Sequence, residues 1–304
     1  MPGGGVERTR SFRATVKVIC WYPAHMSDLS DLTSSPAVTV TVVLCGSDLR
    51  RLGATLSSLD RAVQRLEQRT PLYLIDHSLD ERYSDEVRAL ISESEYSSPL
   101  EIQHLVRTGN PGFGTGHNSI LSLPVGDCHL ILNPDVELQD DFLIRAWQTM
   151  TEQSDVAVLA PRGTNDKGEE EYLAKRYPSV LVLLMRAFAP VWLQKPVHKQ
   201  MSRYELQDLP MSGPLQDVPL LSGCCMVVQP QAFRAVGGFD ERFFLYFEDY
   251  DLCMRLLSEG RVVRDPGHLI VHHGGQAARK GWRHIVWFLR GGLRFFNSWG
   301  WRWV

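Results

Sequence analysis

The sequence predicts an α/β fold with a Rossmann-like, mainly parallel central sheet, helices on both faces, and a C-terminal helical tail rich in aromatic and basic residues. Apolar runs of strand length alternate with segments of helical periodicity through the first half of the chain. The runs are apolar throughout, as expected of strands that helices cover on both sides. Residues 279–304 contain six Lys or Arg, five Trp and no acidic residue.

The first half justifies this prediction element by element. Residues 38–45, VTVTVVLC, form a β-branched apolar run, and leucines and a valine recur at spacings of three and four through 49–66. A strand followed by an amphipathic helix is therefore expected. The same order continues with a strand at 72–76, a helix around 87–91, a strand at 101–106, a glycine-rich turn into a helix near 114–123, and a strand at 129–133.

The second half is more irregular. Residues 162–216 mix charges, prolines and one apolar run, and they contain no recognisable motif. The elements expected around them are strands at 155–161 and 220–228, a short helix from Pro230, an acidic and aromatic stretch at 237–255, and strands at 261–265 and 268–273. Residues 1–36 lack sustained periodicity, which predicts a flexible or accessory segment.

Composition excludes several classes of protein. The chain has 304 residues and a formal net charge of −3, so no overall positive field would attract nucleic acid. Its six cysteines lie mostly in apolar runs without a CxxC pair, as expected of buried, reduced thiols in a cytosolic protein. No secretory signal is expected. The longest apolar stretch, Val180–Leu193, is interrupted by Arg186 and Pro190 and is too short to cross a bilayer.

Polar residues follow three of the predicted strands, among them Arg107 and Asn110 after 101–106. Ligands of parallel sheets collect at the C-terminal ends of the strands. Asp76 ends one strand, where it could accept hydrogen bonds from a nucleotide or simply cap a turn. Asp135 follows Asn133 and Pro134 after another strand. A carboxylate there could hold Mg²⁺ or Mn²⁺ against a diphosphate, or cap the next helix, although Asp140 could supply that cap instead.

The glycine-rich segment 110–118, NPGFGTGHN, permits two interpretations. Three glycines in five residues before a helix would allow backbone N–H groups to approach a phosphate closely. The segment matches neither a P-loop nor GxGxxG, so a tight structural turn explains it equally well.

The stretch 237–255, GGFDERFFLYFEDYDLCMR, places carboxylates beside aromatic residues. Asp249 is a candidate general base, because an apolar wall of Phe243, Phe244, Tyr246 and Phe247 would raise its pKa. We expect these aromatics to shape an acceptor pocket rather than to fill an ordinary core. Glu248 and Asp251 are expected as supports, the latter in an ion pair with Arg255 four residues on.

Two histidines, His272 and His273, end the last predicted strand before a Gly-Gly pair. A histidine at this position could complete the ligand set of a metal bound by Asp135. A hydrogen-bonded histidine near the surface is the alternative interpretation.

Taken in order, these motifs resemble the family 2 glycosyltransferases of GT-A fold, and especially their bacterial rhamnosyltransferase-like branch. The resemblance covers roughly 38–296. It consists of a first strand, the Asp-x-Ser turn at Asp76 and Ser78, the segment from Asn110 to Asn118, NPD, the GGFDERFF stretch, EDYDL, and the late histidine followed by Gly-Gly. Each motif alone is only moderately specific to this family, but the presence of all of them in the family's order is strong support for the resemblance.

The resemblance implies an inverting displacement in which Asp249 deprotonates the acceptor hydroxyl. Asp135 would bind a divalent metal, Mg²⁺ or Mn²⁺, at the donor diphosphate, and His272 matches the family's metal-associated histidine better than His273 does. Asp76 would contact the base or ribose of the nucleotide-sugar. The further donor-binding candidates are Ser78, Asn110, Gly112, Gly114, Asn118 and Asn133, and the acceptor or support candidates are Glu248, Asp251, Gly223, Phe244 and Tyr246.

One departure from the family pattern affects the metal and the donor. Asn133 replaces the first Asp of the more general DxD signature, and an amide oxygen is a weaker ligand, so modest metal affinity is expected. The motif Asn-Pro-Asp is common in the rhamnosyltransferase-like branch. Its presence therefore favours dTDP-L-rhamnose as the donor over related hexose donors. The expected product is a bacterial surface glycan such as lipopolysaccharide or O-antigen.

The expected domains are an accessory segment (1–36), a catalytic domain (37–278, with a nucleotide-sugar half 37–161 and an acceptor half 162–278) and an amphipathic tail (279–304). Apolar residues recur at helical spacing in the tail, which could lie on the cytoplasmic face of the inner membrane near a lipid-linked acceptor. Packing on the domain, or homo-oligomerisation, would also explain it. A metal-dependent nucleotidyltransferase and an inactive sugar-nucleotide or glycan-binding module remain alternative functions.

Overall fold

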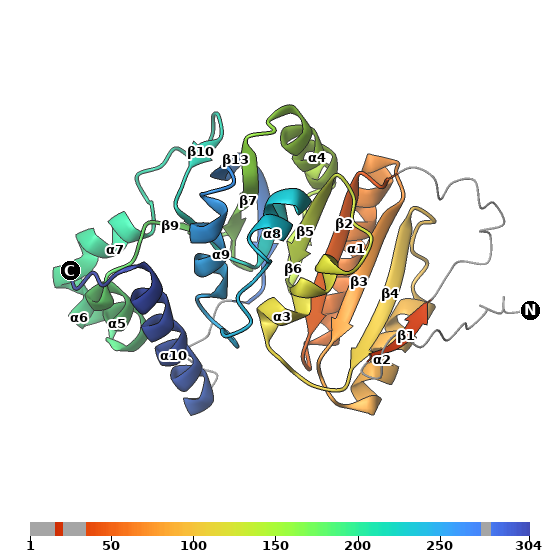
Figure 1. Cartoon of the computed structure of the whole chain (residues 1–304), viewed down its shortest axis with the longest axis horizontal. Coiled ribbons are helices and arrows are strands. Elements are labelled where there is room, and N and C mark those ends of the chain that lie inside the picture. The colour runs from red at the N-terminus through yellow and green to blue at the C-terminus, as the bar shows by residue number, and fades with distance from the viewer. Residues whose placement is uncertain (1–15, 21–34, 275–280) are drawn as a thin grey trace, which may run out of the picture.

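The computed structural model describes residues 16–20, 35–274 and 281–304. Its centre is one large mixed sheet whose main strand order is β1-β4-β3-β2-β5-β12-β7-β13-β10 (Figure 1). Strand β6 pairs with β13 and β8 pairs with β7, both off this path. The sheet provides the framework on which loops from both halves of the chain meet.

The first half of the sheet is parallel, as the sequence predicts. Four neighbouring strands run the same way, and almost all their residues are buried. They are β2 (Val38–Leu44), β3 (Thr70–Asp76), β4 (Leu100–Arg107) and β5 (Cys128–Leu132).

Helices cover this half. Helix α1 (Leu49–Leu66) buries the predicted leucine face, and Asp48 caps it by accepting hydrogen bonds from the N–H groups of Arg50 and Arg51. The other helical elements in the first half are α2 (Glu81–Glu93), α3 (Phe113–His117), the 3₁₀ helix η2 (Asn118–Leu121) and α4 (Phe142–Glu152). The single helix expected near 114–123 is thus a short α-helix that continues as a 3₁₀ turn.

The second half joins the sheet through part of the strand expected at 220–228, whose antiparallel direction the sequence did not reveal. Strand β12 (Cys225–Val228) lies between β5 and β7 (Val156–Thr164) and runs opposite to β5. Because the directions oppose, the beginning of β12 lies beside the end of β5. The Asn133 N–H accordingly donates to the Cys224 carbonyl at 2.8 Å, which brings the loop around Gly223 to the predicted ligand edge.

The two strands expected at 261–265 and 268–273 form one long strand, β13 (Arg261–His272), parallel to β7 and interrupted by a register shift between Asp265 and Leu269. The remaining short strands are β6 (Val136–Leu138), β8 (Glu170–Glu171), β9 (Ala174–Lys175), β10 (Gln216–Asp217) and β11 (Leu220–Leu221), of which β9 and β11 form a separate pair.

The later helices follow the sheet. They are α5 (Val180–Phe188), α6 (Val191–Gln194), the 3₁₀ helix η3 (Lys195–Val197), α7 (His198–Tyr204), α8 (Pro230–Ala235), α9 (Glu248–Leu256) and α10 (Trp282–Trp299). Helices α5, α6, α7 and α10 gather at the end of the molecule opposite β1 (Figure 1). A separate apolar cluster joins α5 to α10 through Val182, Leu183, Phe295 and Phe296.

Strand β1 (Val16–Cys20) pairs antiparallel with β4 at the edge of the sheet. The sequence analysis expected no strand there, and the rest of the segment 1–34 lies outside the described residues. Among the helices that the structure does describe, none combines the length and apolar character needed to cross a bilayer.

Candidate active site

Asp249 lies in the first turn of α9, facing the loop that precedes β12. Its Oδ2 accepts a hydrogen bond from the Gly223 N–H at 3.0 Å, and its Oδ1 accepts from the Tyr250 N–H at 2.9 Å. Burial raises the pKa of the Asp249 carboxyl to about 6, and the two backbone N–H groups oppose this shift. The carboxylate is therefore fixed in position and has a pKa suited to a general base.

Glu248 precedes it and is buried. Burial, and after it the neighbouring Asp249 charge, raises the pKa of Glu248 well above its usual range. Its Oε2 has no hydrogen-bond partner among the described residues. The raised pKa favours the protonated form of Glu248, so Asp249 is the more readily ionised member of this adjacent pair.

Asp251 anchors α9. Its Oδ2 accepts from Arg255 Nε at 2.8 Å, which confirms the ion pair predicted four residues apart, and its Oδ1 accepts from Trp299 Nε1 at 2.9 Å. Both oxygens are thus occupied by protein donors, and Asp251 supports the helix that carries Asp249.

The chain enters α9 through two left-handed residues, Tyr246 (φ 73°) and Phe247 (φ 68°). Such a conformation is costly for bulky residues and persists only where packing imposes it. Helix α10 packs directly against this pair: a Cβ at Gly291 would lie 2.6 Å from the Tyr246 carbonyl oxygen, so only glycine allows the approach. The Tyr246 hydroxyl also lies 2.8 Å from Nδ1 of His284 in the same helix.

The aromatic residues before α9 correct one expectation. Phe243 and Phe247 are buried in the cluster shared with α10, so their assignment to an acceptor pocket is wrong. Phe244 and Tyr246 are partly exposed, and their acceptor role stays a prediction.

The glycine-rich segment is a close-packed turn. A Cβ at Gly112 (φ 107°) would lie 2.4 Å from the Phe244 carbonyl oxygen, one at Gly114 would lie 2.7 Å from Phe239 Cβ, and one at Gly116 would lie 2.6 Å from Val43 Cγ2. These contacts explain all three glycines without a phosphate. The Phe113 N–H completes the contact by donating to the Phe244 carbonyl at 3.1 Å.

Asn118 and Asn110 also make contacts within the protein. Asn118 Nδ2 donates to the Phe239 carbonyl at 2.9 Å, and its Oδ1 accepts from the Phe239 N–H at 2.8 Å. This reciprocal pair ties the turn to the stretch before α9. Asn110 Oδ1 accepts from the Gly112 N–H at 3.0 Å, and its Nδ2 lies 3.1 Å from Cys45 Sγ after β2.

Asp76 ends β3 as predicted, but its side chain is 0% exposed. It accepts hydrogen bonds from the Ser78 N–H (2.8 Å) and the Ser84 hydroxyl (2.6 Å), and His104 Nε2 lies 3.2 Å away. Burial alone would raise the pKa of Asp76, yet these three partners outweigh it and hold the pKa well below its usual range. Contact of Asp76 or Ser78 with a nucleotide stays a prediction.

Asp135 and His272 meet at the other side of the strand ends. Asp135 Oδ1 is buried without a hydrogen-bond partner among the described residues, and His272 Nε2 lies 3.6 Å from it. A Cβ at Gly274 would come within 2.7 Å of both Asp135 Oδ2 and His272 Nε2, so only glycine leaves this space open.

Glu171 completes this arrangement, and the sequence analysis missed it. Its Oε2 lies 2.7 Å from His272 Nδ1, which orients Nε2 toward Asp135. A carboxylate behind a histidine is the usual support of a metal-ligating imidazole. No group of three or more His, Cys, Asp or Glu side chains among the described residues forms a complete metal cage. Asp135 Oδ1, which has no hydrogen-bond partner among the described residues, and the oriented His272 nevertheless fit a cation as two of its ligands. Oxygen atoms of the substrate would supply the other ligands.

His273, in contrast, points to a different set of partners, with Nε2 2.6 Å from Glu137 Oε1 and Nδ1 hydrogen-bonded to Asp166. The structure therefore pairs His272, and not His273, with Asp135. Asn133 follows β5 with its side chain partly buried, and its donor-binding role stays a prediction.

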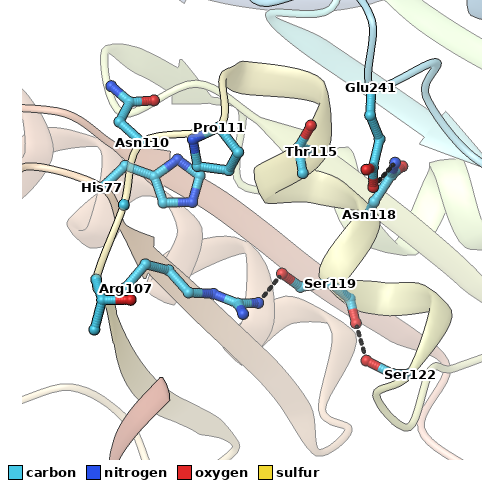
Figure 2. A pocket seen from close by; sticks show the side chains of 11 residues that line it. His77, Arg107, Asn110, Pro111, Thr115, Asn118, Ser119, Ser122 and Glu241 are labelled. Carbon is cyan, nitrogen blue, oxygen red and sulfur yellow. Dashed lines mark hydrogen bonds between the residues drawn. The ribbon is translucent and has the colours of Figure 1, made fainter. Parts of the chain in front are cut away.

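A pocket of about 600 Å³ opens beside the glycine-rich turn (Figure 2). His77, Arg107, Asn110, Thr115, Asn118 and Glu241 are among the residues that line it. Arg107 ends β4 and donates to the Ser119 hydroxyl at 2.6 Å, while its buried Nε has no partner among the described residues. Burial, and then the Arg107 charge, lowers the pKa of His77 to about 4. The pocket thus places the Arg107 guanidinium and a neutral imidazole together with the Glu241 carboxylate, a combination suited to a polar ligand that has both an anionic group and hydrogen-bond donors.

Of the pocket residues, Arg107 lies where the strand-end rule directs attention, because it directly follows the predicted strand 101–106. His77 could have been found by its place next to Asp76. Nothing in the sequence points to Glu171, which comes from an irregular region and acts only through a histidine 101 residues away.

Comparisons with known proteins agree with this architecture. No protein-family model matches the chain. The N-acetylglucosaminyl-diphospho-decaprenol L-rhamnosyltransferase of Mycobacterium tuberculosis (strain CDC 1551 / Oshkosh) is 31% identical over 183 residues, which are 56% of this chain and 58% of that protein. Rhamnosyltransferase WbbL of Escherichia coli (strain K12) is 23% identical over 197 residues, which are 60% of this chain and 70% of that protein.

Among solved structures, GalNAc-T7 with UDP, GalNAc and Mn²⁺ superposes with a TM-score of 0.61 at 12% identity, covering 87% of this chain and 48% of that one. The fold is therefore the GT-A fold, and the predicted resemblance to GT-A glycosyltransferases of the rhamnosyltransferase-like branch is confirmed. The chain spans a little over half the length of the mycobacterial relative.

Proposed function

We propose that this protein is a metal-dependent, inverting glycosyltransferase that moves L-rhamnose from dTDP-L-rhamnose to a hydroxyl of a glycan or lipid-linked saccharide. The observation that supports it most is Asp249, a carboxylate held by the Gly223 N–H with a pKa raised to about 6. The donor rests on the NPD motif and on the rhamnosyltransferase names of the relatives. The wider setting is synthesis of a bacterial surface polysaccharide such as lipopolysaccharide or O-antigen.

In the proposed reaction, Asp249 takes the proton of the acceptor hydroxyl as its oxygen attacks the anomeric carbon of the donor. The new glycosidic bond forms on the face opposite the diphosphate, and the bond from the anomeric carbon to the phosphate oxygen breaks. The nucleoside diphosphate leaves with that electron pair. Configuration at the anomeric carbon is therefore inverted, and the proton remains on Asp249 until solvent removes it.

Asp135 and His272 would hold a divalent cation, Mg²⁺ or Mn²⁺, with Glu171 keeping the imidazole in position. When bound, the cation supplies positive charge for the leaving diphosphate. Two protein ligands leave several coordination positions for phosphate oxygens, which is typical of Mg²⁺ sites. The Mn²⁺ in the GalNAc-T7 structure supports a cation in this fold.

The donor half would be residues 37–161 and the acceptor half 162–278. The pocket beside Arg107 supports this division, because the guanidinium is among its lining residues and could bind an anionic part of the nucleotide. The acceptor side is supported by the name of the mycobacterial relative, which includes a diphospho-decaprenol. A lipid-linked acceptor would place the protein on the cytoplasmic face of the inner membrane as a peripheral protein, with self-association as a further possibility to measure.

The test is to incubate the protein with Mg²⁺ or Mn²⁺ and a panel of nucleotide-sugars and to follow nucleoside diphosphate release with and without a lipid-linked acceptor. We expect release with dTDP-L-rhamnose that increases when the acceptor is added. In a parallel incubation with a nucleoside triphosphate and a sugar 1-phosphate, pyrophosphate release would instead identify a nucleotidyltransferase, and donor binding without turnover in either incubation would identify a binding module. Either result would overturn the proposal.

A further inference from the structure

We propose that α5, α6, α10 and residues 300–304 form one surface that binds a membrane rich in anionic lipid. We call it the lipid-facing surface. It consists of eight exposed apolar side chains on two segments separated by about a hundred residues of sequence: Leu184, Trp192, Trp282, Ile285, Leu289, Leu293, Trp301 and Trp303. Such a surface would add a membrane-binding site of defined lipid class to the proposed glycosyltransferase. Only its link to a lipid-linked acceptor rests on the proposed function.

Helix α10 has two apolar faces, and only one packs on the protein. Gly291, Gly292, Phe295 and Phe296 are its buried residues. The other face carries Trp282, Ile285, Leu289 and Leu293, which are 71%, 42%, 49% and 54% exposed. Their spacing of three, four and four residues places them in one stripe along the helix. A stripe of this kind is the signature of a helix that lies in a membrane interface.

The second segment is fixed to the first by backbone hydrogen bonds. The Val180 N–H donates to the Arg302 carbonyl at 2.7 Å, and the Leu181 N–H donates to the Trp303 carbonyl at 3.2 Å. The start of α5 is therefore held against the residues that follow α10, and Figure 1 shows α5, α6 and α10 together at one end of the molecule. This segment adds Leu184 (43% exposed) and Trp192 (69% exposed).

Charge identifies the partner. The segments of this surface contain five arginines and no Asp or Glu, although the whole chain has a formal charge of −3. Arg186 forms an ion pair with Glu205 at 3.2 Å, and the other four are Arg283, Arg290, Arg294 and Arg302. Two copies of this surface would bring eight such arginines together, which opposes self-association. Anionic headgroups neutralise those cations while tryptophan side chains enter the interface, so an anionic bilayer fits both features.

The lipid-facing surface also adjoins the proposed base. Helix α10 donates a hydrogen bond from Trp299 to Asp251 in α9, two residues from Asp249. A saccharide attached to a membrane lipid would therefore reach α9 from the side at which the protein meets the bilayer.

The experiment is co-sedimentation of the full-length protein with vesicles of phosphatidylcholine alone and of phosphatidylcholine mixed with phosphatidylglycerol. We expect binding only to the mixed vesicles, and weaker binding as salt increases. Trp192→Ser and the double variant Leu289→Ser/Leu293→Ser should each lower the partition coefficient by roughly tenfold, because each removes apolar area from the interface. The control is Leu257→Ser, which changes a leucine that is 45% exposed but lies outside the surface.

Failure of the wild type to bind the mixed vesicles would overturn the inference. So would unchanged binding by Trp192→Ser, since α5 and α6 would then lie away from the membrane. A dimer in light scattering that these variants dissociate, without lipid binding, would assign the surface to a second copy instead. Turnover with a water-soluble acceptor, measured on the same variants, tests the proposed function separately and should stay unchanged.

Discussion

Trp299 Nε1 donates a hydrogen bond of 2.9 Å to Asp251 Oδ1, across 48 residues of sequence. The other oxygen of Asp251 accepts from Arg255. This contact ties α10 to α9, the helix that carries the proposed base Asp249. Deleting 282–304, the simplest test of the tail, would therefore disturb Asp249 as well as any membrane contact, and point substitutions are the sharper test.

Trp299→Phe should destabilise the protein by about 1–3 kcal/mol, because it removes one hydrogen bond from a buried carboxylate while keeping an aromatic side chain. The measurement is the urea midpoint at constant m-value. Trp303→Phe, an exposed tryptophan in the same segment, is the control and should change stability little. Equal midpoints for Trp299→Phe and the wild type would show that the contact contributes nothing.

Asp249→Asn should lower kcat by about 10²- to 10⁴-fold, the usual contribution of a general base, while donor binding stays nearly intact. Turnover and calorimetric titration with dTDP-L-rhamnose measure the two effects. Asp85→Asn changes an exposed carboxylate on α2 and serves as the control. Wild-type turnover by Asp249→Asn would remove this residue as the base.

The rate should fall as pH decreases through about 6, since the base must be ionised and its pKa is raised to about 6. Stability has the opposite dependence. A carboxyl whose pKa is higher in the folded than in the unfolded state binds its proton more tightly when folded, so its contribution to stability decreases as pH rises from about 4 to 6. Asp249→Asn should accordingly be at least as stable as the wild type at pH 8, which thermal melting would check.

Glu171→Gln should weaken Mn²⁺ binding by about 10- to 100-fold, because a carboxylate supporting a ligating histidine has an effect of this size. Asp135→Ala and His272→Ala should weaken it further. Paramagnetic resonance of Mn²⁺ in the presence of nucleoside diphosphate measures the affinity without relying on turnover. Glu169→Gln, an exposed residue two positions earlier, is the control. Unaltered affinity in Asp135→Ala would exclude this site.

Gly112→Ala should destabilise the protein by about 3 kcal/mol or more, since it combines a positive φ with a backbone clash. Gly168→Ala separates the two causes, because Gly168 also has a positive φ (75°) but nothing lies within 4 Å of the added Cβ. Gly168→Ala should lower the free energy of unfolding by only about 1–2 kcal/mol. Similar losses in both variants would show that the contact with Phe244 is unimportant.

The sequence predicted the parallel half of the sheet well, because β2 to β5 are continuous apolar runs and α1 repeats leucine at helical spacing. It also led to Asp135, Asp249 and His272, which follow strands or open a helix. Periodicity could not reveal that β12 runs antiparallel, since a buried strand has the same apolar pattern in either direction. The position of Gly223 beside Asp249 depends on that direction.

Long-range contacts account for the remaining differences. Phe243 and Phe247 look like pocket residues beside a carboxylate, but α10, some forty residues later, covers them. Gly112 and Gly114 look like phosphate-binding glycines, whereas the aromatic stretch before α9 is what approaches them closely. In each case the deciding partner is distant in sequence and carries no local signal.

The left-handed pair Tyr246 and Phe247 also has a consequence for biosynthesis. The packing that holds these residues comes from Gly291 and Gly292, so α9 lacks part of its support until that region has emerged from the ribosome. During translation the parallel half of the sheet, β2 to β5, can fold early, whereas the helix carrying Asp249 reaches its final position only after α10 has been made. Catalytic competence would thus be acquired only after α10 has been synthesised, when the lipid-facing surface can also form.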